Sequence, residues 1–109
     1  MSDLTKSQKR TIRELLGDAH EAEIASALIG VEEAIRKWRC AEILPSEVSD
    51  RIHEFHKEGQ EIFKTYNYLD PMFALARAVA FGFIELSRVP ADLQPRVKEL
   101  ETLVKGDGG

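Results

Sequence analysis

The chain has 109 residues, of which 43% are hydrophobic and 31% charged, and its 15 Lys and Arg against 19 Asp and Glu leave a net charge of −4. These values fit one soluble globular domain and exclude a disordered tail, a membrane protein and a pair of ordinary domains. The acidic balance argues against a general nucleic-acid binder. Because Cys40 is the single cysteine and the N-terminus lacks the apolar stretch of a secretory signal, we expect a cytoplasmic protein without an intrachain disulfide.

Apolar residues recur at spacings of three and four along nearly the whole chain, and no sustained alternating run is present. This pattern predicts an all-α fold. A first short helix is expected over 4–16, because Ser2 or Asp3 can cap its start and Gly17 can end it in the left-handed conformation that glycine tolerates.

Two longer helices are expected next, over about 18–42 and about 46–68, with Ser46 as the cap of the second. Their apolar residues step alternately by four and three positions, which is typical of helices packed lengthwise. The sequence therefore predicts a long antiparallel helical hairpin. Its seam residues are Ile24, Leu28, Val31, Ile35 and Trp38 on one arm and Val48, Ile52, Phe55, Gly59, Ile62, Tyr66 and Leu69 on the other.

Asp70 and Pro71 mark the start of a fourth helix over 71–86, which is apolar on every side and therefore predicted to be buried. It is short for a bilayer span and carries an arginine near its middle. A final amphipathic helix is expected from about 91 or 95 to 105. The prediction is thus a four- to five-helix bundle in a single domain over 1–105, with a glycine-rich tail at 106–109.

One short domain supplies little cover for a helix that is apolar all round, so we expect a homodimer in which the helix over 71–86 or the hairpin beside it meets a second copy. Small residues repeat every four positions along this helix and allow a close helix crossing, although core packing also produces such a stripe. The expected interface residues are Phe73, Ala74, Ala78, Phe81 and Gly82.

Arg77 lies inside this apolar helix, and a buried arginine needs a partner. One interpretation is an ion pair with Glu58 or Glu61 of the preceding helix, or escape of the guanidinium to the surface along its stem. The other is an anionic ligand bound in a pocket between helices, with Tyr66 or His20 nearby. A contact to a second chain is a third alternative.

Side chains that can bind metal are densest around Asp50, His53 and His56. The two histidines are three positions apart, whereas the zinc-protease pattern needs four, and the sequence lacks Glu-x-x-His pairs. Cys40 has no histidine near it in sequence, and there is no glycine-rich phosphate loop. We therefore expect no metal, no cofactor and no catalytic residues, and hence a non-enzymatic protein.

A basic stripe lies on one face of the first predicted helix, formed by Lys6, Lys9, Arg10 and Arg13. A solvated face explains it, and DNA binding is a lesser alternative. The leading hypothesis is a non-catalytic, homo-oligomeric protein-interaction module. The second is a ligand-binding or regulatory bundle that recognises an anionic small molecule through Arg77.

Overall fold

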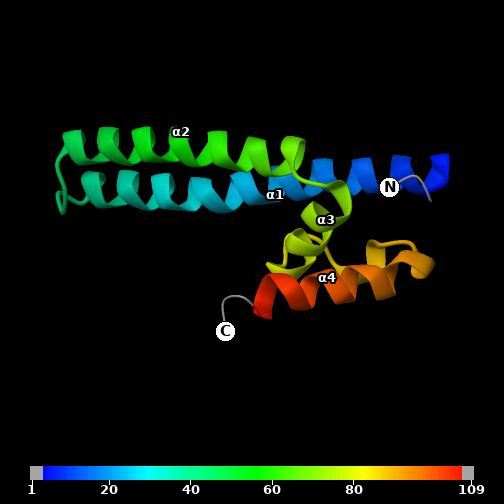
Figure 1. Ribbon diagram of the computed structural model, residues 1–109. Coiled ribbons are helices and arrows are strands. Elements are labelled where there is room, and N and C mark those ends of the chain that lie inside the picture. Colours follow the sequence, from blue (N-terminus) through cyan, green and yellow to red (C-terminus); the bar gives the residue numbers. More distant parts are fainter. Residues whose placement is uncertain (1–3, 107–109) are drawn as a thin grey trace.

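The computed structural model describes residues 4–106, and within this range the chain is helical without strands. The long helices α1 and α2 form an antiparallel hairpin, α3 packs against the N-terminal half of α1, and α4 packs against α3 (Figure 1). The far end of the hairpin extends beyond them, so the molecule measures 55 × 30 × 22 Å. The predicted all-α bundle built on a helical hairpin is confirmed. The elements are α1 (Lys6–Arg39), α2 (Pro45–Tyr68), α3 (Pro71–Ala80), the 3-10 turns η1 (Leu86–Arg88) and η2 (Ala91–Leu93), and α4 (Gln94–Gly106).

The predicted break at Gly17 is wrong, because α1 continues through it as one helix of 34 residues. Ile12, Leu15 and Ala19 pack into the same core on both sides of the glycine and hold the backbone helical there. The helix begins with a capping box, in which the Thr5 hydroxyl accepts from the N–H of Gln8 at 3.0 Å. The caps expected at 2–3 and the tail at 107–109 lie outside the described residues.

The hairpin turn departs from the prediction at both of its ends. The helix α1 ends at Arg39, and Ala41 takes the left-handed conformation with φ of 61°. The expected cap Ser46 lies inside α2, which begins one residue earlier at Pro45. The Glu47 carboxylate accepts the N–H of Leu44 at 2.8 Å and so satisfies a backbone group at this helix start.

The fourth predicted helix is shorter than 71–86, because α3 ends at Ala80. Its start is as expected, since the Asp70 carboxylate accepts from the N–H groups of the second and third helical residues. Gly82 has φ of +82°, and its N–H donates to Val79 while the N–H of the next residue donates to Ala78. This is a Schellman ending, which satisfies the last carbonyls of the helix and turns the chain away.

The main core lies where α3 is enclosed by α1, α4 and the segment between α3 and α4. Five residues of α3 are buried within the single chain, without help from a second copy, and four of them belong to this core. The expectation that this helix needs another chain to cover it is therefore wrong, because the helix is short and rich in small side chains. The core comprises Ile12, Leu15, Ala19, Met72, Leu75, Ala76, Ala78, Ile84, Val89 and Val97.

Candidate interaction surface and ligand pocket

The hairpin exposes a row of large apolar side chains on one side, which we call the open face. On α1 these residues are spaced three and four positions apart, which places them in one stripe on the helix surface. Those on α2 also share one helix face. Two shallow grooves follow this side, one between Ile24 and Phe63 and the other along Leu28, Val31 and Ile35. Four members of the row are 43–49% exposed. The open face comprises Ile24, Leu28, Val31, Ile35 and Trp38 of α1 and Ile52, Phe55 and Phe63 of α2.

The opposite side of the hairpin carries charged residues. A groove there joins Glu23 of α1 to Glu58 and Glu61 of α2, and Phe83 from the segment after α3 lies in it. Nearby, Arg51 reaches across to Gly30, where a Cβ atom would lie only 2.9 Å from its Cζ. The hairpin therefore has a charged side next to α3 and an apolar side away from it.

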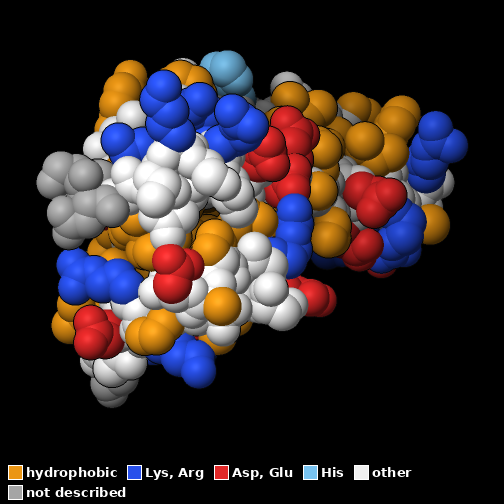
Figure 2. Space-filling model, turned by 90° about the vertical axis from the view of Figure 1, so that its right-hand side faces the viewer, with side chains coloured by type: hydrophobic (Ala, Val, Ile, Leu, Met, Phe, Trp, Pro, Cys, Tyr) orange, Lys and Arg blue, Asp and Glu red, His pale blue; other side chains and the backbone are white. Residues whose placement is uncertain are grey.

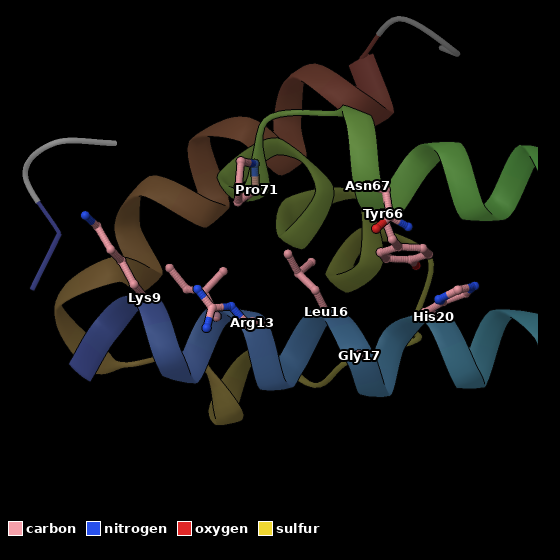
Figure 3. Close-up of a pocket in the computed structure, with 9 residues that line it drawn as sticks. Lys9, Arg13, Leu16, Gly17, His20, Tyr66, Asn67 and Pro71 are labelled. Atoms are coloured by element: carbon pink, nitrogen blue, oxygen red, sulfur yellow. The ribbon is translucent and has the colours of Figure 1, made fainter. Parts of the chain in front are cut away.

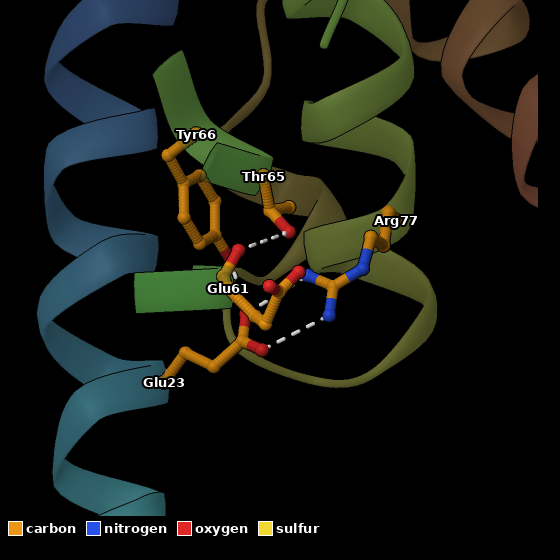
Figure 4. Close-up of polar contacts among 5 residues, drawn as sticks. All are labelled: Glu23, Glu61, Thr65, Tyr66 and Arg77. Atoms are coloured by element: carbon orange, nitrogen blue, oxygen red, sulfur yellow. Dashed lines mark hydrogen bonds and ion pairs between the residues drawn. The ribbon is translucent and has the colours of Figure 1, made fainter. Parts of the chain in front are cut away.

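Arg77 is bound by Glu23 and not by Glu58 or Glu61, the partners expected from the sequence. Its two terminal nitrogens donate to the two carboxylate oxygens of Glu23 at 2.8 and 2.9 Å, and the Tyr66 hydroxyl donates to the same carboxylate at 2.8 Å (Figure 4). The Phe81 ring lies 5.1 Å from the guanidinium. The cluster joins α1, α2 and α3, and its two charged side chains are 22% and 13% exposed.

The charges in this cluster stabilise one another. Burial alone would raise the pKa of Glu23, but the hydrogen bonds from Arg77 and Tyr66 and the positive charge of Arg77 lower it below its ordinary value. The hydrogen bond to Glu23 likewise raises the pKa of Arg77. Burial and the neighbouring carboxylate raise the pKa of Tyr66. Arg77 thus has an ionised partner inside the chain, so it is not an unpaired buried cation that needs a bound anion.

A separate pocket of about 440 Å³ opens between the N-terminal half of α1, the end of α2 and the start of α3. Its cationic groups are Lys9 and Arg13, one helical turn apart on α1 (Figure 3). The imidazole of His20 and the ring of Tyr66 stack with their centroids 5.4 Å apart and form one wall. The remaining lining residues are Ile12, Leu16, Gly17, Asn67 and Pro71.

The basic stripe of the sequence lies beside this pocket. In the view from the N-terminal end of α1, Lys and Arg side chains gather near the top of the molecule (Figure 2). Lys6, Lys9, Arg10 and Arg13 are all exposed, and none forms an ion pair with a residue in 4–106. The pocket therefore lies in a local positive field on a chain whose net charge is negative.

The structure brings together all three ligand residues predicted from the sequence, but only two of them line the pocket. Tyr66 and His20 line the pocket, whereas Arg77 is held by Glu23 and does not line it. Sequence reasoning missed Glu23, and it identified Lys9 and Arg13 only as parts of a stripe. The one signal for Glu23 is its place one turn after His20 on the same helix face.

The other candidate residues are placed as follows. Ala74 and Ala78 are buried inside their own chain and Gly82 lies in the turn after α3, so a helix crossing along these three residues is wrong. Phe73 is half-buried and Phe81 is 56% exposed. In the described part of the chain, no three His, Cys, Asp or Glu side chains come together in a way that could hold a metal, so Asp50, His53 and His56 form no such site.

Comparisons with protein-family models, with curated proteins and with solved structures find no match to this chain. Among residues 4–106, no helix combines the length and the apolarity needed to cross a bilayer. The open face and the pocket are the two features of the structure that point to a function.

Proposed function

We propose that the protein is a non-catalytic interaction module that pairs with a second copy of itself through the open face of the hairpin. The observation that carries this proposal is the open face, on which four large apolar side chains of α1 and α2 are left 43–49% exposed. A layer of two helices covers its apolar stripe only when a further layer packs on it. Two such hairpins together make a four-helix bundle, which is a common stable solution.

Charge at the edges of the open face supports a second copy as the partner. The α1 edge carries Glu32, which borders one groove, and the α2 edge carries His56 and Lys64, which border the other. In a two-fold pair, the same surface meets itself, and α1 of one copy can lie over α2 of the other. The α1 edge with Glu32 then faces the α2 edge with His56 and Lys64, so that the pairing is favourable in charge as well as apolar.

The test is the absolute mass in solution, measured by light scattering behind a sizing column over a hundredfold range of concentration. We expect the mass to rise to twice 12.3 kDa. In the double variant Leu28→Glu with Ile52→Glu, each copy would have to bury two charges in the dimer, so we expect a monomer at every concentration. Both residues are exposed in the single chain, so circular dichroism should show an unchanged helical content.

A matched control is Leu103→Glu, which places the same charge on an exposed leucine of α4, outside the hairpin. This variant should still dimerise. A wild-type mass of 12.3 kDa at the highest concentration would contradict the proposal. So would a dimer that the hairpin variant leaves intact.

A further inference from the structure

We propose that the pocket between α1, α2 and α3 binds a small organic anion, a phosphate or carboxylate attached to a ring or short apolar body. This site is separate from the open face and does not depend on pairing of the hairpin. Lys9 and Arg13 would hold the anionic group, and the stacked rings of His20 and Tyr66 would contact the body of the ligand.

The charge of the ligand follows from the cations at the pocket. The structure gives Lys9 and Arg13 no acidic partner within residues 4–106, although the chain as a whole has more acids than bases. A guanidinium and an ammonium one helical turn apart can donate together to one phosphate or carboxylate. Lys6 and Arg10 lie on the same stripe outside the lining, and they add to the field without contacting the ligand.

The apolar body follows from the rest of the lining. Ile12, Leu16 and Pro71 provide aliphatic surface, and the flat wall of His20 and Tyr66 suits a ring. In Figure 3, Leu16 points from α1 toward the connection between α2 and α3, where Pro71 lies. An inorganic ion would use the cations alone and leave this surface without contacts.

The wall is fixed before any ligand binds. The Tyr66 hydroxyl donates to Glu23, whose carboxylate is held in turn by both terminal nitrogens of Arg77. The ring of Tyr66 is thereby anchored at its outer end, on the side away from the pocket cations. A rigid wall reduces the entropy lost when a ligand binds, which favours specific binding over loose attraction.

The test uses phenyl phosphate as the probe. Its binding to the ¹⁵N-labelled full chain is measured by chemical-shift titration at low salt. We expect saturable shifts confined to residues 9–20 and 66–71. Inorganic phosphate lacks the ring and benzyl alcohol lacks the charge, so each should bind about tenfold more weakly or not at all. The double variant Lys9→Ala with Arg13→Ala should weaken phenyl phosphate binding by about tenfold or more.

The matched control is Lys6→Ala with Arg10→Ala, which removes two charges from the same stripe and none from the lining. It should weaken binding by less than about threefold. Equal losses in the two double variants would mean general electrostatic attraction and would overturn the proposal, as would benzyl alcohol binding as tightly as phenyl phosphate. Because neither variant touches the open face, the mass in solution should stay as in wild type, so failure here is distinguishable from failure of the dimer.

Discussion

The base of the molecule, formed by α3, α4 and the N-terminal half of α1, and the far half of the hairpin use apolar residues in opposite ways. In the base, α3 has neighbours on several sides, and side chains as large as Leu75 and Val97 are completely buried. In the far half of the hairpin, α1 and α2 have only each other, and the best-buried residues there are Ala34 and Val48, at 8% exposure. The number of covering elements, more than the apolarity of the sequence, decides how much of each side chain leaves water.

The two regions meet at the cluster of Glu23, Tyr66 and Arg77. Each residue comes from a different helix, so the cluster ties the hairpin to the base through α3. A bidentate, charge-assisted pair fixes the direction in which its helices approach, which apolar contacts alone do less well. We therefore regard this cluster as a structural link between the hairpin and the base, and not as a ligand site, and we call it the joint.

The largest difference between the two regions should appear when one leucine is shortened in each. Leu75→Ala leaves a cavity in the closed core and should lower the free energy of unfolding by about 3–5 kcal/mol. Leu28→Ala removes a side chain that is already 45% exposed and should cost less than about 1 kcal/mol in the monomer. Urea unfolding followed by circular dichroism measures both values.

Protein concentration sharpens this test. If the open face pairs with a second copy, the cost of Leu28→Ala should grow as the concentration rises, because dimer formation adds to stability. The cost of Leu75→Ala should not. Equal costs for the two variants at low concentration would mean that the far half of the hairpin is as well covered as the base.

The second expected effect concerns the joint. Arg77→Met strands the carboxylate of Glu23 and should cost about 2–3 kcal/mol by urea unfolding. A matched control is Arg88→Met, which breaks the pair of Arg88 with Asp18, whose side chains are 48% and 57% exposed. That pair should contribute less than about 1 kcal/mol. Similar costs for the two variants would remove the distinction between the joint and an ordinary surface pair.

Acid provides an independent measure of the joint. The folded-state pKa of Glu23 is lower than its ordinary value of 4.5, so its contribution is fully present above that value. The contribution is lost as the pH falls through the lower, folded-state pKa. Arg77→Met removes the main cause of the lowering, so the variant should lose less stability than wild type between about pH 5 and pH 3.

The hairpin was predictable from the sequence because its apolar spacing persists over many turns. The burial of its predicted seam was not, because Leu28, Trp38 and Ile52 are 43–49% exposed and lie on the open face. The boundaries were harder. Gly17 carries the local signal of a helix end, yet the contacts of Leu15 and Ala19 with the core hold the helix through it. Gly82 carries the same signal and does end α3, because there the chain must turn back toward α4. Local sequence does not separate these two cases.

The candidate sites were predictable only in part. The need of Arg77 for an acid follows from its apolar surroundings, but Glu23 lies 54 positions away and sequence spacing gives it no advantage over Glu58 or Glu61. The stripe containing Lys9 and Arg13 is visible in the sequence. Its position beside Tyr66 depends on where α2 ends and on how it packs across α1, which only the folded structure provides.

The smallest expected effect compares the turns that end α3 in the base and α1 in the hairpin. Both turns are Schellman endings, but the left-handed position is Gly82 in the base and Ala41 in the hairpin, with φ of 61°. Holding a residue with a Cβ in the left-handed conformation costs roughly 1–2 kcal/mol of stability, which glycine avoids. Glycine in turn loses about 0.5–1 kcal/mol, because it has more conformational freedom in the unfolded chain.

Ala41→Gly should therefore stabilise the protein by about 0.5–1 kcal/mol, and Gly82→Ala should destabilise it by a similar amount. Thermal unfolding resolves both, since 1 kcal/mol shifts the midpoint by about 4–8 °C in a domain of this size. A loss of stability in Ala41→Gly would mean that the alanine methyl makes contacts at the hairpin tip worth more than the backbone strain. The turn would then contribute to stability in the region where α1 and α2 otherwise cover only each other.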